Sequence, residues 1–200
     1  MAGSLLAFGV ALAVAACGGE RQDENESEGR YRVEVVQASF PQEQSLARRS
    51  KLVIVVRNAD SKAIPNVGVT LNGFDVRERN PDLADPNRPV FVINSRQKRI
   101  AGFSEEKEAS PEGCDTAYVE TWACGRLRAG EEKRFVWDVT AVKAGPYRLK
   151  YTINAGLDGK AKAIDVDGGP PSGFFVGTIS DKPPQARVAD DGRTIIRGTR

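Results

Sequence analysis

Few side chains in this chain of 200 residues could carry nucleophilic or metal chemistry. The chain contains no histidine, so Ser-His-Asp and Cys-His catalysis are excluded, as are histidine-ligated zinc, haem and blue-copper sites. Its one methionine is Met1, which leaves no thioether ligand for copper. Two Ser-x-x-Lys pairs, Ser95–Lys98 and Ser104–Lys107, have the spacing used by serine acylases, but neither lies in a helical pattern and no Lys-Thr-Gly partner is present. The sequence therefore predicts no enzyme, no cofactor and no metal centre.

Carboxylates are the remaining route to catalysis or to calcium binding. They gather in two stretches of the chain: Asp75, Glu78, Asp82 and Asp85, and then Asp165 and Asp167. Calcium needs six to eight converging oxygens, and a glycosidase needs two carboxyl groups across one bond. Because no EF-hand or repeat spacing is present, solvated loop acids are the favoured interpretation.

Basic residues form two clusters within a chain whose net charge is +2. Residues 18–29 carry −4 and residues 1–17 carry no charged side chain, so residues 30–200 carry +6. Either cluster could guard an edge strand or face an anionic cell-wall polymer. No aromatic residues alternate with the cations as base stacking requires, so no nucleic-acid partner is expected. The clusters are Arg48, Arg49 and Lys51, and Arg96, Lys98 and Arg99.

The first 17 residues predict export and a lipid anchor. Residues 3–16 are apolar or small and would span about 21 Å as a helix, too short for a hydrocarbon core of about 30 Å but suited to a signal peptide. The tetrad Val14-Ala15-Ala16-Cys17 resembles the bacterial lipobox. That resemblance implies cleavage before Cys17, lipidation of its thiol and a membrane-anchored, extracytoplasmic protein. No Lys or Arg precedes the apolar run, which departs from the usual signal, and cleavage at Ala-x-Ala without lipidation is the alternative.

Residues 17–29 are expected to form an acidic, disordered tether. No apolar residue occurs after Cys17 in this segment, so it cannot bury enough surface to offset the entropy of ordering. Such a tether would hold the following domain away from the membrane.

The two other cysteines, Cys114 and Cys124, are expected to form a structural disulfide. An exported protein reaches a compartment where disulfides persist, and closing this loop contributes about 3 kcal/mol on the chain-entropy estimate. Two free buried thiols or a reactive pair are the alternatives. The ten-residue offset is unlike the Cys-x-x-Cys of redox sites, which favours the bridge.

From Tyr31 onward the hydrophobic pattern has a period of two, which predicts strands. Phe135, Trp137 and Val139 share one face of such a strand, and residues 51–57 are apolar on both faces, as in a central strand. Turn residues separate the strands, and at most one helical turn is expected, at 104–109. The pattern predicts an all-β antiparallel sandwich of about seven to nine strands. Its expected strands are 31–35, 51–57, 67–71, 89–93, 117–123, 134–140, 147–154 and 160–166.

Several of these segments resemble bacterial immunoglobulin-like modules of the CARDB (cell-adhesion-related) type. Residues 52–58 and 64–70 are similar to the opening strands, and residues 127–137 and 144–149 to the closing strands. The resemblance covers residues 30–166, interrupted by an insertion at 74–116, and implies an immunoglobulin-like sandwich. It places Tyr147 at the corner-tyrosine position and Leu149 where the second inter-sheet cysteine would be.

Residues 167–200 are expected to form a Gly/Pro linker, an edge strand at 174–179 and a flexible tail with a hairpin turn at 190–192. With the signal peptide at 1–16, the sequence predicts a lipid-anchored, non-catalytic binding or scaffolding module of the cell envelope. An accessory subunit that docks a partner envelope protein and a carboxylate-based secreted hydrolase are the alternatives, because this fold hosts many functions.

Overall fold

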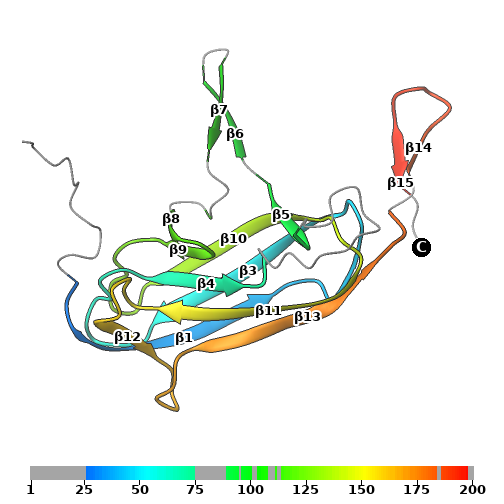
Figure 1. Ribbon diagram of the computed structural model, residues 1–200. Helices are drawn as coiled ribbons and strands as arrows, with labels where there is room; N and C mark the ends of the chain where they lie inside the picture. The colour runs from blue at the N-terminus through cyan, green and yellow to red at the C-terminus, as the bar shows by residue number, and fades with distance from the viewer. Residues whose placement is uncertain are drawn as a thin grey trace, which may run out of the picture.

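The computed structural model describes residues 26–74, 89–94, 96–100, 103–107, 111, 114–183 and 186–197, which fold as two packed β-sheets and two separate hairpins. Figure 1 shows the sheets lying face to face, with the hairpins projecting from them. No helix occurs in this part of the chain, so none there could cross a membrane. The expected fold class, an all-β immunoglobulin-like sandwich, is confirmed.

The first sheet has five strands, in the spatial order β12 (Ala161–Ile164), β1 (Gly29–Ser39), β3 (Arg49–Asn58), β10 (Glu132–Ala141) and β5 (Phe91–Ile93). The central strand β3 is apolar on both faces, as predicted: Leu52, Ile54 and Val56 are fully buried against the second sheet, and Val53 and Val55 are each 8% exposed.

The second sheet has six strands, in the order β2 (Glu43–Ser45), β13 (Ser172–Ser180), β11 (Gly145–Asn154), β4 (Gly68–Asn72), β9 (Thr121–Ala123) and β8 (Asp115–Tyr118). Most pairings are antiparallel, but β12 pairs with β1 and β2 with β13 in parallel. The two hairpins are β6 (Arg96–Ile100) with β7 (Phe103–Lys107) and β14 (Ala186–Val188) with β15 (Ile195–Arg197).

The core lies between the sheets and contains the residues whose alternation predicted it. Phe135, Trp137 and Val139 of β10 are at most 1% exposed. Trp137 packs edge-on against Trp122 of β9, with ring centroids 5.4 Å apart. Burial of large aromatic side chains dominates the energetics of such a core.

One expected strand and one expected helical turn differ from the structure. Residues 117–123 are not one strand: Glu120 adopts a left-handed conformation (φ 59°) and the chain reverses there to form the β8–β9 hairpin. Trp122 therefore faces the core and is 4% exposed. The helical turn expected at 104–109 is also wrong, because residues 103–107 form β7.

The sandwich continues past the expected boundary at residue 166. Strand β13 pairs with β11 along eight residues, a longer strand than the expected edge segment 174–179. Its Gly173 and Gly177 lie opposite Tyr151 and Tyr147, and a Cβ at either glycine would collide with the facing tyrosine hydroxyl. Gly173 of the expected linker and Gly177 of the expected edge strand thus make room for tyrosine side chains of the neighbouring strand β11.

Tyr147 does not act as a corner tyrosine. Its hydroxyl donates a hydrogen bond to the backbone carbonyl of Pro41, 106 residues upstream, and accepts one from Gln44 Nε2 at 3.4 Å. A corner tyrosine bonds to backbone only a few residues upstream. Here the side chain fixes the segment before β2 against the sheet instead, and burial raises the pKa of its phenol.

The Cys114–Cys124 disulfide is confirmed, with the two Cα atoms 4.1 Å apart. It closes the base of the β8–β9 hairpin beside Trp122.

At the C-terminal end, residues 190–192 turn the expected hairpin. Asp191 Oδ1 accepts backbone hydrogen bonds from Arg193 and Thr194, both at 2.8 Å. The hydrogen bond from the Thr194 hydroxyl, with these two backbone bonds, lowers the pKa of Asp191 to about 2.

Candidate binding groove

A groove of about 870 Å³ lies where the edge strand β12 of the first sheet meets the end of β11 in the second. Its walls come from Glu28 and the start of β1, from the end of β11 and residues between 156 and 164, and from β4, β8 and β9. Segments more than 100 residues apart in sequence therefore build one surface, at the end of the sandwich where β1 begins (Figure 1).

Hydroxyl and amide groups form one side of the groove. Thr121, Thr70 and Thr152 stand in a row across β9, β4 and β11. They point away from the core because their neighbours in β4, Val69 and Leu71, are buried inward. Thr70 Oγ1 lies 2.9 Å from Thr121 Oγ1 and accepts a hydrogen bond from Asn154 Nδ2 at 2.9 Å. This row offers hydrogen bonds to a hydroxylated or anionic ligand.

Three cations also line the groove: Arg30, Lys160 and Lys162. Arg30 and Lys162 are aligned residues of the parallel β1–β12 pair, and both are exposed. Their inward neighbours Tyr31 and Ala163 are buried, which sends both cations to the outer side. Like charges directly opposite each other destabilise a strand pair, so this arrangement favours a bound anion. Glu28 is the only acidic residue of the described chain that lines the groove.

The charged groups around the groove are held by loop contacts. Arg30 Nη2 donates to the carbonyl of Gly168 at 3.1 Å, and Lys160 Nζ pairs with Asp158 Oδ2 at 2.9 Å. Asp165 Oδ1 accepts from the backbone amides of Asp167 and Gly169, at 2.9 and 3.0 Å, and so orders the turn that supports Gly168. The carboxylate of Asp165 thus has a structural role in this turn, and Asp167 contributes a backbone amide to it.

The first predicted basic cluster, Arg48, Arg49 and Lys51, does not line this groove. Arg49 and Lys51 lie at the start of β3, opposite Thr140 and Asp138 of β10, and Arg48 lies in the turn before β3; all three are exposed. Arg96, Lys98 and Arg99 belong to β6, and their side chains lie outside the described part of the structure.

Two other sets of predicted site residues are not described. Cys17 and the acids Asp75, Glu78, Asp82 and Asp85 lie outside the described residues. Within the described residues, no three Cys, Asp or Glu side chains are grouped so that they could hold a metal ion.

Sequence reasoning missed the groove because Arg30 is separated from Lys160 and Lys162 by more than 120 residues. The available signals were local: Lys160 and Lys162 alternate with small residues in a predicted strand, and Arg30 precedes another strand. Nothing in the spacing indicated that these two strands pair in parallel. The missing information was therefore the pairing rather than the residue types.

The fold and groove define an immunoglobulin-like sandwich with a cationic edge. No protein-family model matches the chain, and no curated protein matches it in sequence. Among solved structures, the chain is similar to a CARDB domain from Pyrococcus furiosus in complex with di-metal ions, at 11% identity and a TM-score of 0.40, covering 76% of this chain and 93% of that one. The CARDB type expected from the sequence is therefore among the structures it resembles.

Two further similarities cover small parts of large proteins. One is to Escherichia coli alpha-2-macroglobulin, at 14% identity and a TM-score of 0.41, covering 78% of this chain and 7% of that one. The other is to a beta-glucosidase from Listeria innocua, at 15% identity and a TM-score of 0.34, covering 75% and 16%. These scores are low, so the architecture is defined by the sheets of this chain itself.

Proposed function

We propose that this protein is a lipid-anchored, extracytoplasmic module of the bacterial cell envelope that binds an anionic polymer and does not catalyse a reaction. The observation that carries this proposal is the aligned pair Arg30 and Lys162, which lines the same groove as Lys160 and a row of threonines. Cationic clefts attract polyanions and raise their local concentration. The residues outside the signal and tether also carry a net +6.

Binding is favoured over hydrolysis by the residues of the groove. A two-carboxylate glycosidase needs its carboxyl groups about 5–9.5 Å apart. Among the described residues, the groove is lined by Glu28 alone of the acids. The absence of histidine from the whole chain removes the commonest general base.

Retention of the exported chain on an immobilised carboxylate polymer, such as polygalacturonate, tests the groove. Lys160→Ser with Lys162→Ser should elute at clearly lower salt than the unmodified chain, because each lost cation weakens attraction within a Debye length of about 8 Å. Arg48→Ser with Arg49→Ser is the matched control, since it removes the same charge from one predicted cluster. Equal elution of both double variants would contradict a specific groove. Earlier elution of the control alone would move the site to the start of β3.

The anchor is proposed from the Val14-Ala15-Ala16-Cys17 tetrad. Cys17→Ala should move the protein from the membrane fraction to the soluble exported fraction. Cys114→Ser with Cys124→Ser is the control and should remain in the membrane fraction. If Cys17→Ala stays with the membrane, the anchoring proposal is wrong.

Docking of a partner envelope protein is a second candidate, favoured by an exposed apolar pair on β13. Phe174 is 50% and Val176 49% exposed on the outer face of the six-stranded sheet, and the Arg148 guanidinium lies 3.9 Å above the Phe174 ring. Aromatic residues and arginine are enriched at protein interfaces. Cross-linking in intact cells should capture a partner that Phe174→Ser loses. Capture that is unchanged in Phe174→Ser would argue against this surface.

A further inference from the structure

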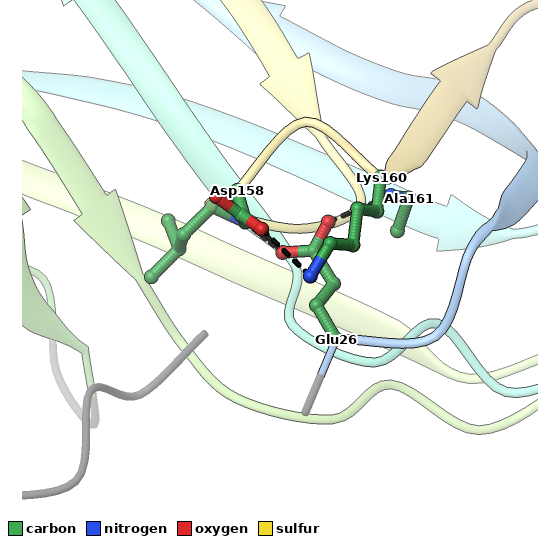
Figure 2. A network of polar contacts seen from close by, with 5 residues as sticks. Glu26, Asp158, Lys160 and Ala161 are labelled. Atoms are coloured by element: carbon green, nitrogen blue, oxygen red, sulfur yellow. Dashed lines mark hydrogen bonds and ion pairs between the residues drawn. The ribbon is translucent and has the colours of Figure 1, made fainter. Parts of the chain in front are cut away.

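The loop from Gly156 to Ala161 holds a carboxylate that belongs to the chain itself. Figure 2 shows Glu26 reaching into this loop from the segment before β1. Its Oε2 accepts hydrogen bonds from the backbone amides of Leu157, at 2.6 Å, and Asp158, at 2.8 Å, and its Oε1 accepts one from Ala161, at 2.6 Å. Three backbone donors that converge on one carboxylate form an anion-binding concavity.

The loop is shaped for this group. A Cβ at Gly156 would collide with the carboxylate carbon and both carboxylate oxygens of Glu26, so glycine is required for the approach. The donors are backbone amides that address two oxygens, which suits a planar carboxylate. Charge-assisted hydrogen bonds of this kind are about twice as strong as neutral ones. The loop therefore binds a carboxylate through its backbone amides alone, without using any of the loop's own side chains.

This carboxylate receptor forms part of the groove. Gly156, Leu157 and Ala161 line the groove, and so does Glu28, two residues after Glu26. The acidic segment expected to be a disordered tether is thus ordered at Glu26, and its Glu28 lines the groove together with Arg30, Lys160 and Lys162. In this position Glu26 occupies the place that an acidic ligand would take.

We propose that the loop Gly156–Ala161 is a carboxylate-binding site, that Glu26 occupies it in the free protein, and that a carboxylate group of the bound polymer displaces Glu26. The displacement rests on the proposed function of the groove, and it assigns the ligand to polymers that carry carboxylates, because a carboxylate is the group that the loop holds in the free protein. The apparent affinity of a site that is open only part of the time is reduced by the open fraction. Removing Glu26 therefore strengthens binding of the external carboxylate.

The test compares Glu26→Ala with Asp181→Ala in the exported chain bearing Cys17→Ser, on immobilised polygalacturonate and on immobilised polyphosphate. Both substitutions remove one negative charge, but Asp181 is an exposed residue just after β13 and does not line the groove. Glu26→Ala should bind polygalacturonate about tenfold more tightly if Glu26 fills the loop about 90% of the time. Asp181→Ala should show only the small gain that any lost negative charge gives. On polyphosphate the two variants should be equal.

Amide resonances give a second, direct measurement. In the ¹⁵N-labelled chain, Glu26→Ala and Glu26→Gln should shift the amide signals of Leu157, Asp158 and Ala161, while signals of the core strands stay in place and show that the fold is intact. Adding N-acetylglutamate should shift these three signals in Glu26→Ala at concentrations that leave the unmodified chain unchanged. Equal responses of the two proteins would overturn the inference.

The two proposals fail in different ways. Lower retention of the lysine variant, together with equal retention of Glu26→Ala and Asp181→Ala on polygalacturonate, would overturn the displacement of Glu26 and leave the groove function standing. Full retention of the lysine variant would overturn the groove function, while the N-acetylglutamate titration would still decide whether the loop binds a carboxylate.

Discussion

The interior of the sandwich and the end where β1 begins are stabilised in different ways. In the interior, side chains such as Leu52, Phe135 and Leu149 are at most 1% exposed and make apolar contacts between the sheets. At the end where β1 begins, polar side chains such as Glu26 and Asn58 bond to the backbone of segments far away in the sequence. The interior therefore depends on burial, and this end depends on satisfying particular backbone groups.

The difference shows which changes each region tolerates. A core position accepts another apolar residue of similar volume at modest cost. A polar side chain that pairs with backbone groups has no such substitute, because the groups it leaves behind lose their partner. Substitutions in the interior should therefore destabilise the fold through lost burial, and substitutions at this end through unpaired backbone groups. The losses in free energy of unfolding should differ in size as well.

The largest effect is expected for Trp137→Ala in the interior. The side chain is 1% exposed and packs against both Phe135 and Trp122. Its removal should lower the free energy of unfolding by about 3–5 kcal/mol, as truncation of large core residues does. Val136→Ala, on the outer face of the same strand, should cost much less in the same chemical denaturation. Equal denaturation midpoints for the two variants would contradict the assigned core face.

Loss of the Cys114–Cys124 bridge should cost less than loss of the tryptophan. The ten-residue separation gives about 3 kcal/mol on the chain-entropy estimate, from which any native-state strain is subtracted. Denaturation of the double serine variant should match that of the reduced protein. Mass spectrometry without reduction should show a loss of two hydrogens, and freely alkylated thiols in the native protein would refute the bridge.

Asn58→Ala tests the polar end of the sandwich. Asn58 is fully buried, its Nδ2 donates to the carbonyls of Lys62 at 2.8 Å and Leu127 at 3.0 Å, and its Oδ1 accepts from the Asp60 amide at 2.9 Å. Leaving such groups unpaired should cost about 1–3 kcal/mol. Asn58→Asp keeps the acceptor but loses the donors, so its cost separates the two contributions. A cost near zero for Asn58→Ala would show that burial alone stabilises this loop.

The smallest effect is expected from the pH dependence of Asp60. The backbone amide of Arg32 donates to Asp60 Oδ2 at 3.1 Å and, with the amides of Lys62 and Ser61, lowers the pKa of this carboxyl below 3.8. The folded-state pKa thus lies below the unfolded one, so this contribution is present above about pH 4 and is lost as the pH falls through the lowered value. Asp60→Asn should reduce stability at about pH 6 and lose its difference from the unmodified chain at about pH 2. A constant difference across this range would contradict the assignment.

The features that could be predicted from the sequence lie mainly in the interior, and those that could not lie mainly where distant segments meet. Alternation identified the buried face of β10 and the central position of β3, because period two is a local property of the chain. The reversal at Glu120 was missed because a left-handed conformation in a non-glycine residue leaves no sequence signal. The length of β13 was missed because Gly173 follows the Gly/Pro run typical of a linker, and the tyrosine that requires this glycine lies in another strand.

The sequence by itself determined the all-β class, most of the core and the absence of any histidine chemistry, and it favoured the bridge between the last two cysteines. Each of these depends on residue type or on spacing within a few residues. Tertiary structure alone decided that Arg30 lies beside Lys162 and that Glu26 enters a loop 131–135 residues further along the chain. Strand pairing and loop closure set these contacts, and neither can be read from local periodicity because the partners are fixed only when the sheets assemble.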